Sequence, residues 1–113
     1  MNHEAILKLI EDGEAILEAN PPGNNPEAIR QLQTIADSLL AASNNNGVID
    51  QKCGGMMEAA EIAYAPRRRQ SYTREHAAYI ASTDLGKMRI HIHQLQHAQS
   101  PPTTKRRAPG RET

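Results

Sequence analysis

Apolar residues recur at helical spacing in four stretches of this chain, and short polar or proline-containing segments separate these stretches. The most regular stretch runs from Thr73 to Ala98, where six apolar residues follow one another at intervals of three and four: Ala78, Ala81, Leu85, Met88, Ile92 and Leu95. Such a heptad-like seam is typical of a helix that packs against another helix at a shallow crossing angle. The partner of the seam can be another helix of the chain or a second copy.

A first helix is predicted from His3 to Ala19, with Asn2 as its N-cap and Pro21 just beyond its end. Its apolar face consists of Ile6, Leu9, Ile10, Ile16 and Leu17. Gly13 lies on or near this face, although glycine inside a helix costs about 1 kcal/mol relative to alanine. We therefore expect another helix to cross close to Gly13.

The second helix carries a strong start signal, with Asn25 as N-cap and Pro26 at the first helical position. Its apolar stripe ends near Ser43, and the polar segment 44–47 forms a turn after it. A short connection between two amphipathic helices favours an antiparallel hairpin.

The third helix is the least regular. Its apolar residues, Ile49, Cys53, Met56, Ala60 and Ala63, have helical spacing, and Pro66 ends the segment. Two consecutive glycines, Gly54 and Gly55, interrupt the pattern. We expect a kink at these glycines or a helix that starts only near Met56, because glycine disfavours a helix interior.

The pattern disappears after residue 99. Residues 100–113 contain no apolar side chain larger than that of Ala108 and include several prolines and basic residues. Such a segment has too little to bury to offset the entropy of ordering it. The sequence therefore predicts an all-α domain over residues 1–99, a small bundle of three to four helices, followed by a disordered basic tail over residues 100–113.

Large apolar side chains are scarce in this chain. Ile, Leu, Val and Met number 23 in 113 residues, and there is no Phe and no Trp. Self-association is a common remedy for a small domain with so thin a core. We therefore expect a homo-oligomer that forms through the seam, in which Asp84 of one copy faces Arg89 of a parallel partner.

The charge distribution is lopsided although the net charge is zero. Residues 1–65 have a balance of −7 and residues 66–113 a balance of +7. Attraction between the two halves, within a chain or between copies, is one interpretation. The other is contact with nucleic acid or another polyanion through seven basic residues: Arg67, Arg68, Arg69, Lys105, Arg106, Arg107 and Arg111.

Few residues of the chain are candidates for catalysis or for metal binding. His93 and His97 have the spacing of two ligands of one metal, but they fall on the outer face of the last helix, and His91 flanks the seam. Cys53, the single cysteine, lies on an apolar stripe, where a thiol is buried and unreactive. We expect no catalytic residue, no metal site and no cofactor.

These observations favour a non-enzymatic, oligomeric binding protein that acts as an adaptor or regulator through contacts with an unidentified protein partner. Its size, composition and basic tail suit a phage or mobile-element accessory protein. The absence of a long apolar run predicts a cytoplasmic protein without membrane contact. The alternative is a nucleic-acid-binding protein that recognises phosphates through Arg67–Arg69 and the tail.

Overall fold

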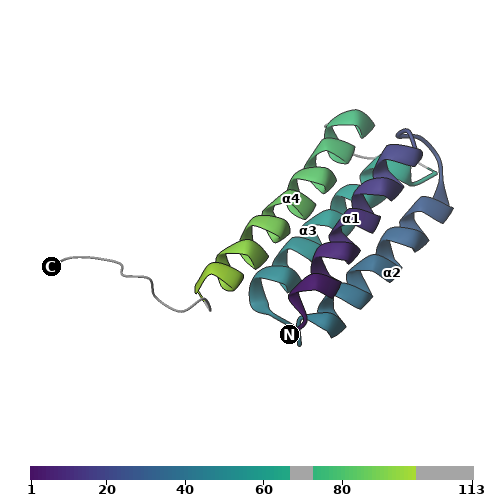
Figure 1. Ribbon diagram of the computed structural model, residues 1–113. Coiled ribbons are helices and arrows are strands. Elements are labelled where there is room, and N and C mark those ends of the chain that lie inside the picture. The colour runs from purple at the N-terminus through teal and green to yellow at the C-terminus, as the bar shows by residue number, and fades with distance from the viewer. Residues whose placement is uncertain (67–72, 99–113) are drawn as a thin grey trace, which may run out of the picture.

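The computed structural model describes residues 1–66 and 73–98, and these residues form four α-helices without a strand. The helices are α1 (His3–Ala19), α2 (Pro26–Ala42), α3 (Gly47–Tyr64) and α4 (Arg74–Ala98). Successive helices run antiparallel, and α4 packs against both α3 and α1, so the four helices close into a bundle (Figure 1). The predicted all-α bundle is therefore confirmed, whereas the predicted tail lies outside the described residues.

Side-chain caps define where the helices begin. Asn2, Asn25, Asn46 and Thr73 each accept a hydrogen bond from backbone N–H groups of the following first turn, at 2.9–3.2 Å. The first N–H groups of a helix have no acceptor within the helix, so the side-chain oxygen of the cap residue accepts a hydrogen bond from them. The predicted caps at Asn2 and Asn25 are confirmed.

Helix α3 begins at Gly47 and continues unbroken through its two glycines, so the predicted late start near Met56 is wrong. The two glycines have different surroundings. A Cβ atom at Gly54 would meet nothing within 4 Å, whereas a Cβ atom at Gly55 would lie 2.6 Å from Oδ2 of Asp84 on α4. The lack of a side chain at Gly55 thus lets the buried Asp84 carboxyl group fit between α3 and α4.

Helix α4 crosses α1 at Gly13, as the sequence predicts. A Cβ atom at Gly13 would lie 3.2 Å from both methyl carbons of Leu85 on α4 and 3.4 Å from Cγ2 of Ile35 on α2. These are tighter than ordinary van der Waals contacts. Glycine at this position therefore lets the Leu85 side chain lie directly against the α1 backbone.

The loop between α1 and α2 closes the C-terminal end of α3. The backbone N–H groups of Gly23 and Asn25 donate to the carbonyl oxygens of Ala63 and Tyr64, at 3.0 and 2.8 Å. In the opposite direction, the Tyr64 hydroxyl donates to the carbonyl oxygen of Asn20 at 2.8 Å. These bonds satisfy carbonyl groups at the ends of α1 and α3, and the Ala63 carbonyl oxygen also accepts from Nη1 of Arg74 at 3.2 Å.

The core is built from aliphatic, alanine and methionine side chains, with Tyr64 as its largest member. Between Tyr64 at one end and Ile49 at the other, all four helices contribute to it. None of the four helices within the described residues has both the length and the apolar composition to cross a membrane.

Candidate interaction surface

The apolar seam of α4 lies inside the bundle. Ala81, Leu85, Met88 and Ile92 are completely buried, and Ala78 and Leu95 are partly buried against the same core. The helices that cover them are α1 and α3 of the same chain. A second copy can reach the seam only if the bundle opens, so contacts of the folded chain with a partner have to use other residues.

Of the two charged residues that flank the seam, Arg89 has a partner within the chain and Asp84 is buried between two helices. Arg89 forms two hydrogen bonds to the Glu14 carboxylate on α1, one of them 2.9 Å between Nη1 and Oε2. The hydrogen bonding that Arg89 donates to Glu14 is the main reason that the pKa of Arg89 is raised. Asp84 is 9% exposed beside Gly55. The expected pairing of Asp84 with Arg89 of another copy would therefore compete with existing contacts.

The residues predicted to bind a polyanion, Arg67–Arg69, Lys105–Arg107 and Arg111, all lie outside the described residues. The described residues carry twelve acidic and six basic side chains, a balance of −6. The acidic excess lies in residues 1–66, with a balance of −7, whereas residues 73–98 have a balance of +1. Helix α4 is thus the least acidic side of the bundle.

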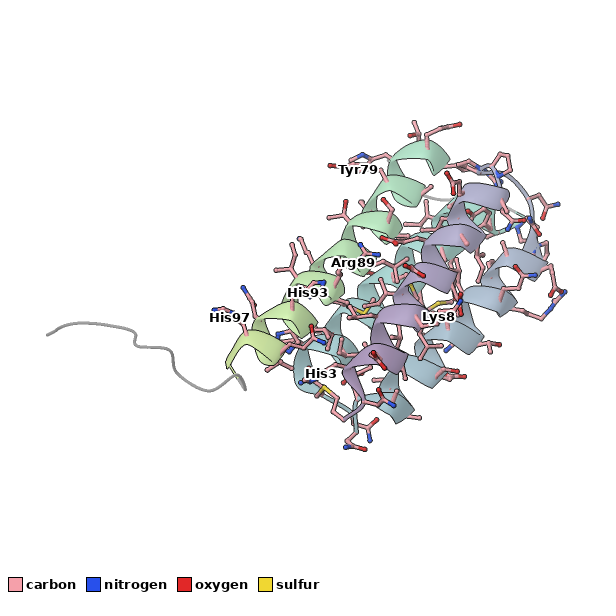
Figure 2. All side chains as sticks on the ribbon, in the orientation of Figure 1. His3, Lys8, Tyr79, Arg89, His93 and His97 are labelled. Carbon is pink, nitrogen blue, oxygen red and sulfur yellow. The ribbon has the colours of Figure 1, made fainter. Side chains whose placement is uncertain are left out.

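The outer face of α4 exposes two large apolar side chains. Tyr79 is 66% exposed and Ile90 is 58% exposed, and apart from Met1 they are the exposed large hydrophobic residues of the described segments. They are eleven residues apart, which on a helix is about three turns and leaves them within about 20° of one another. Tyr79 projects away from the bundle, and Arg89 of the same helix points toward α1 (Figure 2).

Uncharged residues connect these two side chains. We define the outer stripe as Tyr79, Thr83, Gly86, Ile90, His93 and His97, which are spaced by four, three, four, three and four positions. A Cβ atom at Gly86 would meet nothing within 4 Å, so the backbone there is accessible from outside. The neighbouring Ser82 hydroxyl donates to the carbonyl oxygen of Tyr79 at 2.9 Å. Another helix can therefore approach α4 at Gly86 without burying a charged side chain.

The histidines of α4 divide between two environments. His93 and His97 are exposed on the outer stripe, as the sequence predicts, and Nδ1 of His93 lies 3.1 Å from Oε1 of Gln96. His91 is half-buried, and its Nε2 atom is enclosed without a hydrogen-bond partner. Within residues 1–66 and 73–98, no three His, Cys, Asp or Glu side chains gather closely enough to hold a metal ion.

Cys53 is buried in the core, as its place on the apolar stripe predicts. It is 3% exposed, and its Sγ atom lies 3.9 Å from the carbonyl oxygen of Ala36 and 4.0 Å from Sδ of Met88. Burial is the main cause that raises the pKa of this thiol to about 11. The thiolate is the nucleophilic form of cysteine, so Cys53 is protonated and unreactive at neutral pH.

Sequence reasoning directed attention to the seam of α4 and missed the outer stripe. The signal was present, because Tyr79 and Ile90 stand on the polar side of the heptad pattern, where an apolar residue has no core to enter. Two such residues on one face are more informative than either alone. Comparisons of the chain with protein-family models, with curated proteins and with solved structures find no match.

Proposed function

We propose that this chain is a non-enzymatic helical binding protein, an adaptor or regulator that contacts a protein partner through the outer stripe of α4. The exposure of Tyr79 and Ile90 on one helix face carries this proposal. Single apolar residues scattered over a surface are ordinary. These two share one face, and the residues of the outer stripe between them, Thr83 and Gly86, are small and uncharged.

The chemistry of the outer stripe favours a helical partner. Tyrosine is enriched among the residues that contribute most to protein interfaces, and Tyr79 offers an aromatic ring with a polar hydroxyl group. Gly86 leaves room for a close approach, and small residues at a helix crossing allow a short distance between the axes. The partner therefore has an apolar stripe of its own, wide enough to cover Ile90.

Photo-cross-linking tests this proposal. A benzophenone amino acid replaces Tyr79 in the expressing cell, and the matched control carries it at Gln31, an exposed position on α2. We expect a discrete protein adduct from position 79 and none from position 31. The change Ile90→Glu places a charge in the stripe and should remove the adduct while leaving the thermal midpoint unchanged, because Ile90 is exposed. An adduct that survives Ile90→Glu would contradict the proposal.

Phosphate-directed nucleic-acid binding is the alternative function, and the opposite charges of the two halves of the chain favour it. A change of Arg67, Arg68 and Arg69 together to alanine removes up to three phosphate contacts. The slope of log affinity against log salt should then fall by up to about 2.7, at about 0.9 per contact on duplex DNA. A mobility shift that is lost in this variant, with an unchanged oligomeric state, would favour the alternative.

A further inference from the structure

We propose that the outer stripe binds a second copy of this chain, with the two α4 helices antiparallel and crossing at Gly86. The proposal rests on the proposed function, because it uses the same stripe, and it names the partner. Two-fold symmetric pairs of identical chains are the commonest soluble oligomers. In such a pair, residues at equal distances on either side of Gly86 face one another.

The sizes of the side chains match in this register. Ile90 and Ser82 each lie four residues from Gly86, so Ile90 meets Ser82 of the partner subunit. Tyr79 and His93 each lie seven residues from Gly86, so the phenol ring meets an imidazole ring. Gly86 meets itself, where neither copy has a side chain to separate the backbones. Large residues thus face small ones, and the two aromatic rings face each other.

The charges match as well. Glu75 and His97 each lie eleven residues from Gly86, which places a carboxylate beside an imidazole that can donate a hydrogen bond to it. Lys87 falls opposite the buried Leu85 and meets no second cation. A parallel pair would instead place Glu75 against Glu75 and Lys87 against Lys87, and like charges in register are unfavourable. The charge pattern therefore favours the antiparallel orientation.

The other helices of the bundle are less suitable for a contact between copies. The balance of −7 over residues 1–66 divides into −4 on α1, −1 on α2 and −2 on α3, so like faces repel one another at short range, most strongly at α1. Residues 73–98 have a balance of +1, and the outer stripe itself contains no Asp, Glu, Lys or Arg. Because the whole chain has a net charge of zero, there is no net electrostatic repulsion between two copies at long range.

The dimensions of the contact, which extends one turn beyond the outer stripe to Glu75, indicate a weak dimer. From Glu75 to His97 the helix extends about 33 Å at 1.5 Å per residue, and a strip about 10 Å wide gives about 700 Å² for both copies together. Stable interfaces bury about 1,200–2,000 Å². The dimer is therefore expected to form and dissociate readily, at protein concentrations of roughly 10 µM to 1 mM.

Sedimentation velocity over this concentration range tests whether the pair forms. We expect the weight-average sedimentation coefficient of the full chain to rise with concentration. Ile90→Glu should raise the dissociation constant at least about tenfold, a loss of about 1.4 kcal/mol. Gln31→Glu adds the same charge to an exposed position on α2 and should leave the constant unchanged. An equal effect of the two changes would overturn the proposal.

Disulfide trapping tests the register. Gly86→Cys should give a disulfide-linked dimer under mild oxidation, since two Cα atoms within about 4.4–6.8 Å can be bridged. Gly54→Cys is the control, because it also faces open space but lies on α3. A mixture of Tyr79→Cys and His93→Cys chains should give mainly the mixed dimer. Equal trapping at positions 86 and 54, or mainly unmixed Tyr79→Cys dimers, would overturn the antiparallel pair.

The two proposals fail in different ways. A chain that stays monomeric up to about 1 mM and gives no disulfide at position 86 refutes the second copy as partner. If position 79 still cross-links a different protein in the cell, the binding function survives and only the identity of the partner is wrong. If position 79 gives no adduct either, both proposals are wrong.

Discussion

Two adjacent glycines of α3 provide a matched test of how closely α4 packs against this helix. Gly54 and Gly55 have the same helical context, and replacing either by alanine should gain about 1 kcal/mol of helix propensity. Only Gly55 has a neighbour in the way, because its new methyl group would lie 2.6 Å from Oδ2 of Asp84. The difference between Gly54→Ala and Gly55→Ala therefore isolates the contact between α3 and α4.

The expected magnitudes have opposite signs. Gly54→Ala should raise the free energy of unfolding by about 1 kcal/mol, since its Cβ atom meets nothing within 4 Å. At Gly55 the same gain is opposed by overpacking, which costs about 1–3 kcal/mol in a packed interface, because the Asp84 side chain is only 9% exposed and has little room to move. The two variants should differ by roughly 2 kcal/mol, or about 10 °C in thermal midpoint for a domain of this size.

Thermal and urea unfolding followed by circular dichroism measure this difference. A double-mutant cycle adds Asp84→Ala, which removes the carboxyl group that the new methyl would meet. In that background, Gly55→Ala should stabilise the protein about as much as Gly54→Ala does. If Gly55→Ala raises the thermal midpoint of the wild-type chain as much as Gly54→Ala, the Asp84 carboxyl group does not approach α3 and this reasoning is refuted.

Three further substitutions test polar groups that are buried or partly buried. Burial raises the pKa of Asp84, so the folded chain loses stability as the pH rises above the pKa of the unfolded chain, about 3.9. Asp84→Asn should therefore be more stable than wild type at pH 7. An advantage that does not shrink toward pH 3 in urea titrations would contradict this. Tyr64→Phe leaves the carbonyl oxygen of Asn20 without its donor and should lower the free energy of unfolding by about 1 kcal/mol, which chemical denaturation can measure. Glu14→Gln removes the negative charge of the ion pair with Arg89 and should lower the free energy of unfolding by up to about 1 kcal/mol, less in high salt. An effect that does not depend on salt would show that packing rather than charge is lost.

The sequence alone determined where α1, α2 and α4 begin and end, because these signals act over three or four residues. Asn2 and Asn25 cap the helices that follow them, and α1 has the predicted bounds, His3–Ala19. A cap needs only an N–H group within its own first turn. Gly13 was informative for a related reason, since glycine on the apolar face of a helix has little use other than a close crossing.

Only the tertiary structure decided what each helix contacts. Helical spacing showed that α4 has an apolar seam, but a seam has the same pattern whether α1 and α3 cover it or a second copy does. Arg89 forms hydrogen bonds with Glu14, which is 75 residues away in the sequence. No local sequence signal specifies a partner at that separation. In the sequence, Gly55 is only an interruption of the apolar pattern of α3. The structure shows that glycine at this position leaves space for the Asp84 carboxyl group of α4. Closing the bundle covered the seam with α1 and α3, whereas Tyr79 and Ile90 on the outer face of α4 stayed exposed because no other helix of the described segments packs there.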